Sequence, residues 1–172
     1  MSDTIQTIVG IDAPADEAQR LAEMMQRWLI QEGIADSTGH PGPNWAFATA
    51  PGGDNGFRRL VTNDVKIQVG RQVFTAMENG IELQCSTCRA VFEPEARWIE
   101  AVEQWFHGDD RTLFACPVCG GAERLNEWRG PIQWGFGHLG VEFWNWPRLS
   151  DDFVRAAGEV LGSRVIVVDA HV

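Results

Sequence analysis

Four cysteines are the residues of this chain best suited to do chemistry, and they occur as two Cys-x-x-Cys pairs. Cys85 pairs with Cys88 and Cys116 with Cys119, and 27 residues, 89–115, separate the pairs. This spacing can place four thiolates at the corners of a tetrahedron, which is the geometry of structural Zn²⁺ sites. Two disulfides or four free thiols are the alternatives. We expect one structural zinc ion per chain, bound by all four cysteines.

The residues around each cysteine pair resemble the knuckles of zinc ribbons. Cys116-Pro-Val-Cys119-Gly120 is similar to the Cys-Pro-x-Cys-Gly knuckle, and Gln84-Cys85-Ser-Thr-Cys88-Arg89 is similar to its partner. A glycine after the second cysteine lets such a turn close without a Cβ clash. The resemblance implies a zinc-ribbon-like segment, and we assign residues 81–129 to it. Zinc ribbons serve many roles, so the resemblance does not by itself imply a function.

Enzyme chemistry finds little support in the sequence. A zinc ion with four thiolate ligands has no open position for water, and no further cysteine is present as a nucleophile. His138 and Glu142 form the best remaining acid–base pair, because residues four apart on a strand share a face. The letters of Gly135-Phe-Gly-His-Leu-Gly140 match the dinucleotide-binding fingerprint. We reject that match because a strand, 141–144, is expected where the fingerprint requires a helix.

The charge of the chain is acidic, with 24 Asp and Glu against 14 Lys and Arg and a formal net charge of −10. Nonspecific affinity for nucleic acid comes mainly from cations that neutralise phosphates, and no segment forms a basic patch. Nucleic acid is therefore an unlikely partner. An acidic chain instead attracts a basic protein partner.

No apolar run approaches the ~20 residues needed to span a bilayer, and the N-terminus has no basic segment before an apolar one. These features predict a cytoplasmic protein with no membrane partner. A reducing compartment also keeps the four thiols available to a metal.

Hydrophobic periodicity predicts a single α+β domain over residues 1–172. A strand at 4–9 precedes a helix that begins near Asp12 or Pro14 and ends at Gly33, and a helix from Ser150 to Gly162 precedes a strand at 164–168. Four short strands are expected between them, at 59–62, 66–69, 72–75 and 81–84, together with one at 45–47 in the loop 36–56. The turn signal Asn79-Gly80 predicts that 72–77 and 81–84 form a hairpin. We expect a two-layer sandwich, with a ferredoxin-like fold as the leading topology, and the ribbon inserted in its middle.

A further helix is expected between the two cysteine pairs. It opens at Glu93-Pro94-Glu95 and ends near Gly108. Its apolar positions fall at i, i+4, i+7 and i+8, and its two tryptophans are expected to pack against the metal site or the main sheet. These positions are Trp98, Val102, Trp105 and Phe106.

The stretch 128–147 contains four of the eight tryptophans. It suggests either core packing or an aromatic surface for a partner, since exposed tryptophans anchor interfaces. The favoured hypothesis is a zinc-stapled protein-binding module, such as an adaptor or an immunity or antitoxin-like inhibitor of a basic partner. The alternatives are a nucleic-acid accessory protein and an enzyme that uses the 128–147 loop as its pocket. The predicted partner-binding residues are Trp134, Trp146, Glu100, Glu103, Asp109 and Asp110.

Overall fold

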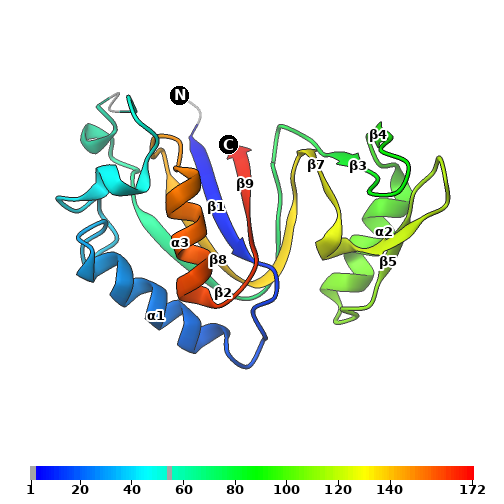
Figure 1. Ribbon diagram of the computed structural model, residues 1–172, viewed down its shortest axis with the longest axis horizontal. Helices are drawn as coiled ribbons and strands as arrows, with labels where there is room; N and C mark the ends of the chain where they lie inside the picture. The colour runs from blue at the N-terminus through cyan, green and yellow to red at the C-terminus, as the bar shows by residue number, and fades with distance from the viewer. Residues whose placement is uncertain (1–2, 54–55) are drawn as a thin grey trace.

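The computed structural model describes residues 3–53 and 56–172, which form two lobes (Figure 1). One lobe, called here the sandwich, contains both ends of the described chain. The other, called here the cysteine lobe, is the segment 75–134 between two strands of the sandwich. Among the described residues, no helix has both the length and the apolar character required to cross a bilayer.

The sandwich contains four strands and two helices in the order β-α-β-β-α-β. The sheet order is β2-β8-β1-β9, and every neighbouring pair is antiparallel. This is the ferredoxin-like arrangement. The two-layer α+β architecture predicted from the sequence is confirmed. The elements are β1 (Thr4–Gly10), α1 (Ala18–Gln31), β2 (Val65–Phe74), β8 (Gly135–Trp144), α3 (Asp151–Leu161) and β9 (Val165–His171).

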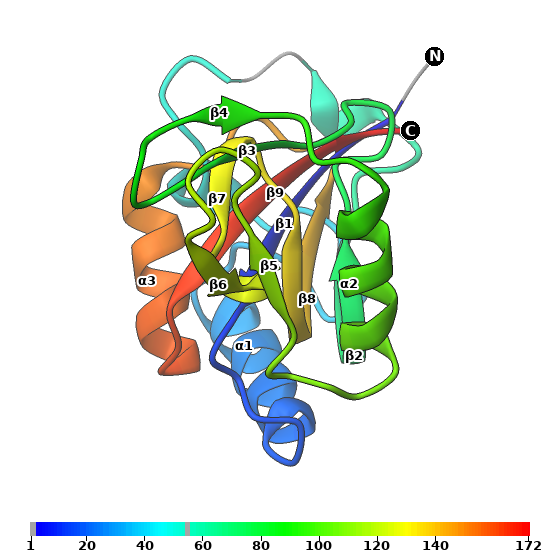
Figure 2. The same ribbon diagram turned by 90° about the vertical axis from the view of Figure 1, so that its right-hand side faces the viewer.

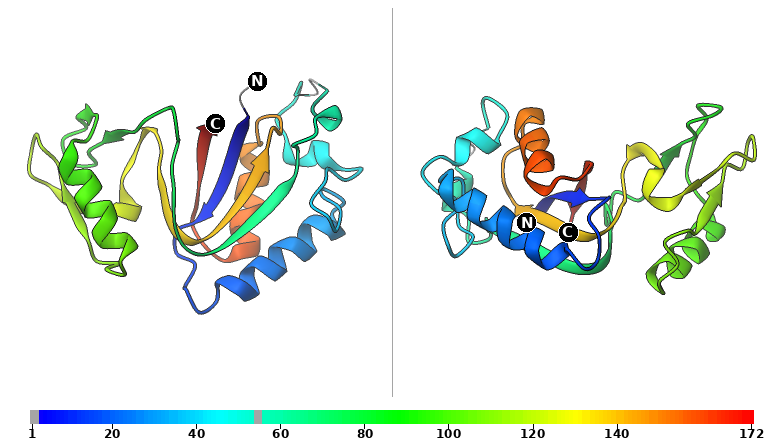
Figure 3. Two further views of the ribbon diagram at one scale, coloured as in Figure 1. Left: turned by 180° about the vertical axis from the view of Figure 1, so that it is seen from behind. Right: turned by 60° about the horizontal axis from the view of Figure 1, so that its bottom comes forward.

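Both helices of the sandwich lie against one face of the sheet (Figure 1, Figure 3). α1 is amphipathic, and its buried residues Leu21, Met25 and Leu29 repeat every four positions. α3 begins at Ser150, whose Oγ accepts a hydrogen bond from the backbone N–H of Phe153 at 3.1 Å. Every second side chain of β8 points toward the helices and fills the core between the two layers. These are Leu139, Val141 and Phe143, each 0% exposed.

The other face of the sheet is covered at one end because β2 and β8 curl over it. The ring of Phe74, at the end of β2, lies over Gly140 of β8, where an added Cβ would be 2.4 Å from the ring. Only glycine allows this close approach. Phe74 packs there with Val9 and Val168 from β1 and β9. The curl carries both strands out of the sandwich and into the cysteine lobe (Figure 1).

The cysteine lobe is built from short strands around one helix, and Figure 2 shows it in front of the sheet. Its strands form a three-stranded sheet, β4-β3-β7, and a two-stranded sheet, β5-β6. The insertion predicted at 81–129 lies within this lobe, and β7 extends the pairing of β3 to residue 132. The elements are β3 (Glu82–Gln84), β4 (Val91–Phe92), α2 (Ala96–Phe106), β5 (Leu113–Ala115), β6 (Ala122–Arg124), the 3-10 helix η3 (Leu125–Glu127) and β7 (Arg129–Ile132).

Polar contacts join the two lobes. Arg164, just before β9, pairs with Asp12 of the sandwich and with Glu127 of η3, each at 2.8 Å. These hydrogen bonds from Arg164 lower the pKa of both carboxyls. At the other end of the interface, Arg71 of β2 donates to the carbonyl oxygen of Trp105 at 2.7 Å and pairs with Asp110 at 2.6 Å. These contacts tie the two lobes together.

Several predicted strands are wrong. The predicted hairpin of 72–77 with 81–84 does not form, because β2 pairs with β8 and β3 pairs with β4 and β7. Asn79-Gly80 is still a turn, but it connects two different sheets. The strands predicted at 66–69 and 72–75 are one bulged strand, β2. The segment 45–47 lies in a 3-10 helix, η1 (Trp45–Ala48). The segment 59–62 begins with the last residue of another, η2 (Phe57–Arg59), and continues without regular structure.

Candidate metal centre

The four cysteines lie close together at the outer end of the cysteine lobe. Their sulfur atoms all lie within 4.8 Å of one another. Cys85 Sγ is 3.7 Å from Cys119 Sγ, and Cys88 Sγ is 3.8 Å from Cys116 Sγ. Four sulfurs placed tetrahedrally around a metal at 2.3 Å would be roughly 3.8 Å apart. None of the four cysteines forms a disulfide in the structure, and the group could hold a metal ion.

Two turns of the same design present the sulfurs. In the first knuckle the amide of Arg89 donates to the carbonyl of Cys85 at 3.0 Å, and in the second that of Gly120 donates to Cys116 at 2.9 Å. In the second turn an amide hydrogen bond also reaches each sulfur, from Val118 to Cys116 Sγ and from Gly121 to Cys119 Sγ, both at 3.4 Å. Such hydrogen bonds stabilise thiolate charge.

Backbone amides act on the first knuckle as well. The backbone N–H of Cys88, followed by that of Thr87, lowers the pKa of the Cys85 thiol to about 6. An ionised sulfur is the form that binds metal. The two knuckles also touch one another, because the Ser86 hydroxyl donates to the carboxylate of Glu123, next to the second knuckle. Backbone amides therefore favour the ionised form of Cys85. At Cys88 the Ala90 amide acts in the same direction, but burial and the neighbouring sulfurs outweigh it and raise the pKa of that thiol to about 11.

Aromatic side chains cover one side of the sulfur group. Cys85 and Cys116 are buried and belong to the same core as Trp98 of α2 and Trp128. Cys88 and Cys119 are exposed on the opposite side. Trp105 extends this core to β8, where its ring lies 5.3 Å from that of Phe136. The expectation that the two helix tryptophans pack toward the cysteines and the sheet is met, whereas Phe106, an apolar position of the same predicted pattern, is 53% exposed.

The two knuckles differ at the residue that follows each pair, and this difference predicts a stability effect. Arg89 has φ 64° and Gly120 has φ 77°, both in the left-handed region that disfavours residues with a Cβ. We expect Arg89→Gly to stabilise the protein by about 1 kcal/mol, since the Arg89 side chain is exposed. Gly120→Ala should destabilise it by about 1 kcal/mol through backbone strain alone, because open space surrounds that position.

Urea denaturation of the metal-loaded protein, followed by tryptophan fluorescence, measures both changes. Gly80→Ala is the matched control: it has φ 75° and open space, but it lies in a turn away from the knuckles. It should destabilise by a similar amount without changing metal affinity. A loss of stability in Arg89→Gly would contradict the strain argument.

The residues predicted to bind a partner do not share one surface. Glu100 and Glu103 are exposed on α2, and Asp109 is exposed in the turn after it. Asp110 is also exposed, but its charge is paired with Arg71. Trp134 is half-buried, packs against the inner side of α2 through Trp98 and donates to the carbonyl of Gly80 at 2.9 Å. α2 therefore separates Trp134 from the exposed glutamates.

Trp146 lies in the core of the sandwich and not on a surface. It is 4% exposed, and its ring contacts those of Phe57 and Phe143 at 5.4 and 5.2 Å. Its indole N–H donates to the carbonyl of Asn63 at 2.7 Å. The prediction that Trp146 contacts a partner is corrected, because the residue is enclosed by its own domain.

The outer side of α2 carries apolar residues that the sequence reasoning missed. Ile99 is 48% and Phe106 is 53% exposed. They lie seven residues apart, so they share one side of the helix, and Glu103 lies next to both. The sequence signal that could have identified this surface is a pair of apolar residues at i and i+7, on a side of the helix that the buried positions do not occupy. Glu100, Glu103 and Asp109, with Gln104 and His107, line a shallow depression beside this stripe.

His138 and Glu142, the candidate acid–base pair, share the sheet face opposite α1 and α3, as their spacing predicted. The Glu142 carboxylate accepts hydrogen bonds from the indole of Trp144 at 3.0 Å and from Gln68 at 3.4 Å. The His138 ring lies 6.2 Å from that of Trp105, and burial lowers its pKa. Both side chains are engaged by neighbouring aromatic residues rather than by each other.

Fold and site together define a class: a ferredoxin-like α+β sandwich that carries, between its second and third strands, a lobe with four cysteines that could hold a metal ion. The comparisons with known proteins add no nearer relationship. No protein-family model, no curated protein and no solved structure matches the chain. Functional conclusions therefore rest on the residues of this chain.

Proposed function

We propose that the chain is a protein-binding module, that a structural zinc ion holds its cysteine lobe together, and that the outer side of α2 binds a basic partner. The observation that carries the proposal is the juxtaposition of exposed apolar and acidic side chains on one helix. Ile99 and Phe106 supply apolar contact area, and Glu100 and Glu103 supply charge. Interfaces of this kind combine an apolar anchor with a charged rim.

The choice of zinc follows from the ligands. Four thiolates at tetrahedral spacing suit Zn²⁺, whereas hard cations such as Mg²⁺ and Ca²⁺ require oxygen ligands. A site with four protein ligands leaves no position for water, which supports a structural role. In this proposal, zinc fixes the two knuckles, and the knuckles with their aromatic core fix α2.

The same surface argues against the nucleic-acid alternative. The outer side of α2 is acidic, and the chain has a net charge of −10, so phosphates would be repelled. We propose a basic protein as the partner and expect no binding to generic duplex DNA or RNA at physiological salt. An immunity or antitoxin-like role, in which the acidic surface blocks a basic toxin, is one form of this proposal.

Charge reversal and truncation on α2 test the proposal. A tagged chain purified from its native host should retain a stoichiometric basic protein, whose binding is then titrated with purified components. Phe106→Ala should weaken binding by about 2 kcal/mol if Phe106 is an anchor. Glu100→Lys should slow association, with the largest effect at low salt. Circular dichroism should show both variants folded, because both side chains are exposed.

Glu159→Lys is the matched control, because Glu159 is an exposed glutamate on α3 in the other lobe. It changes the net charge as much as Glu100→Lys does, but it should leave the association rate nearly unchanged. Equal effects of the two reversals would show that only overall charge matters. Nucleic acid in the eluate, released by added salt, would contradict the proposal and favour the accessory-protein alternative.

A further inference from the structure

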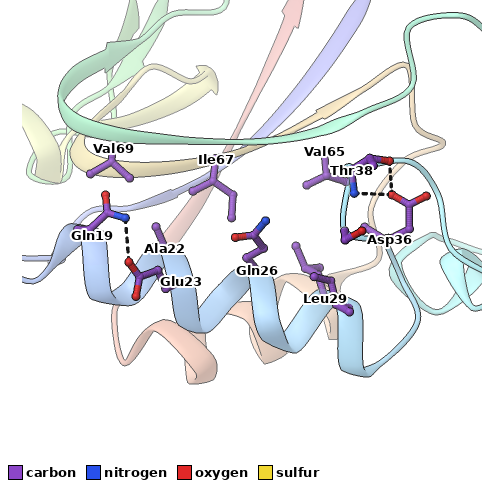
Figure 4. Close-up of a pocket in the computed structure, with 14 residues that line it drawn as sticks. Gln19, Ala22, Glu23, Gln26, Leu29, Asp36, Thr38, Val65, Ile67 and Val69 are labelled. Atoms are coloured by element: carbon purple, nitrogen blue, oxygen red, sulfur yellow. Dashed lines mark hydrogen bonds between the residues drawn. The ribbon is translucent and has the colours of Figure 1, made fainter.

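A groove runs between α1 and the edge strand β2 of the sandwich (Figure 4). Its volume is about 470 Å³. Figure 4 shows Val65, Ile67 and Val69 pointing from β2 toward α1, with Ala22 and Gln26 on the helix below them. Val69 and Ile30 are 45% and 39% exposed. The groove therefore has an apolar floor that is open to solvent and lies beside a strand edge.

The outer edge of β2 has backbone groups in position to pair with another strand. β2 is the first strand in the order β2-β8-β1-β9, so only one of its edges is paired within the sheet. The N–H of Val65 points to the free edge, where it donates to the carbonyl of Gly39 at 2.7 Å. Because alternate residues of an antiparallel strand point the same way, the N–H and C=O groups of Ile67 and Val69 also point outward.

One residue of the chain already occupies the position of an added strand. Gly39 covers the edge at Val65, and the loop that carries it turns away before Ile67. Over the described ranges 3–53 and 56–172, no hydrogen bond from outside the sheet reaches Ile67 or Val69. Exposed edges of this kind pair with extended segments of other chains.

The charge around the groove favours some added strands over others. Its charged lining residues are Glu23 and Asp36, both acidic. The Thr38 hydroxyl, together with the Thr38 amide, holds the pKa of Asp36 below its usual value, so this carboxylate stays ionised at neutral pH. A second copy of the chain would bring the same acidic groups against these two. A segment with lysine or arginine would instead meet opposite charge.

We propose that the β2 edge binds an extended, basic and apolar peptide segment of a partner protein by strand addition. Main-chain hydrogen bonds to Ile67 and Val69 hold the segment, and alternate side chains enter the groove over α1. Basic residues belong at the positions that face α1, near Glu23. They are disfavoured at the intervening positions, which face the side of the sheet where Lys66 lies over Trp144, 4.1 Å from its ring centroid. The site is on the sandwich and is independent of the outer side of α2.

Selection from a random peptide library on the immobilised, metal-loaded protein tests the proposal. The expected consensus has apolar residues and Lys or Arg at the alternate positions that face α1, and no Lys or Arg at the intervening positions. The synthetic consensus peptide is then titrated against the wild type and three variants. Val69→Pro removes an outward N–H, which a sheet edge tolerates, and should weaken binding roughly tenfold. Glu23→Lys should weaken it several-fold. Glu32→Lys should not, because Glu32 is an exposed glutamate at the C-cap of α1 and lies outside the groove.

A modified peptide tests the same hydrogen bonds without a substitution in the protein, so the test does not depend on whether the Val69→Pro variant folds. N-methylation of the peptide at the amides that face β2 leaves the protein intact and should abolish binding, whereas methylation at the intervening amides should not. The proposal is overturned if no peptide is selected, if both methylated peptides bind equally, or if Glu23→Lys leaves affinity unchanged. It is also overturned if the wild type sediments as a dimer that Glu23→Lys strengthens, since the edge would then pair with a second copy.

The result is separable from the α2 proposal. Phe106→Ala and Glu100→Lys should bind the consensus peptide as the wild type does. Loss of peptide binding in these two variants would place the peptide on α2 and overturn the assignment to β2.

Discussion

Cys116→Ser is expected to abolish stoichiometric zinc binding and to unfold the cysteine lobe while the sandwich stays folded. Cys116 is a buried ligand in the aromatic core, and the strands around it are only two to four residues long. Strands this short do not persist without a further constraint. The metal site of such a lobe exists only in the folded state, so the free energy of metal binding stabilises the fold. In small zinc domains this free energy is on the order of 10 kcal/mol at neutral pH.

Metal content by mass spectrometry and amide signals by NMR measure the two halves of this prediction. The wild type should hold about one zinc per chain, as expected for a four-thiolate site. Cys116→Ser should hold none and should lose signal dispersion in 75–134 but not in β1 or α3. Val118→Ala is the control, because Val118 lies in the same knuckle with a 68% exposed side chain that is not a ligand. A wild type that carries no metal, or a variant that keeps one tightly bound zinc, would refute the zinc assignment.

Trp146→Ala is expected to destabilise the sandwich by about 3–5 kcal/mol, the range for removing a large buried aromatic side chain. The substitution empties a site between Phe57 and Phe143 and leaves the carbonyl of Asn63 without its indole donor. A loss of this size is a large fraction of the 5–15 kcal/mol that holds a domain together. Thermal and urea denaturation of the metal-loaded protein measure it.

Two matched substitutions locate the effect. Trp146→Phe keeps most of the ring but loses the N–H, and it should cost about 1–3 kcal/mol. Trp134→Ala should cost less than Trp146→Ala, because Trp134 is only half-buried, and its effect should fall on the cysteine lobe. If Trp146→Ala were as stable as the wild type, the residue would be at the surface and its assignment to the core would be wrong.

The two proposed binding surfaces lie on different lobes, and each depends on a different stabilising element. The outer side of α2 depends on the cysteine centre, since α2 packs on the core that contains Cys85 and Cys116. The β2 edge depends on the sandwich core. Metal removal should therefore abolish binding at α2 and leave peptide binding at β2 intact. The metal-free protein thus distinguishes the two binding surfaces in one sample.

Some properties of this protein were determined by its sequence alone. The spacing of Cys85, Cys88, Cys116 and Cys119 predicted a joint metal site. All four residues offer the same ligand atom, and one tight turn is enough to bring the two sulfurs of each pair together. The long elements at both ends were found from local patterns. The helices α1 and α3 follow from apolar repeats of 3.6 residues, and β9 follows from its continuous run of β-branched apolar residues. The Ser150 cap and the Gly162 stop of α3 were found for the same local reason.

Only the tertiary structure decided which strands pair and which large side chains are buried. Asn79-Gly80 has the local chemistry of a hairpin turn, yet β2 pairs with β8, about 70 residues away in the sequence, because pairing is governed by long-range burial of apolar faces. The same holds for the aromatic residues: Phe106 fits the apolar periodicity of its helix but is exposed, and Trp146 was predicted to contact a partner but is enclosed. Whether an apolar side chain becomes core or contact surface depends on what the rest of the chain places against it, and local sequence does not encode that.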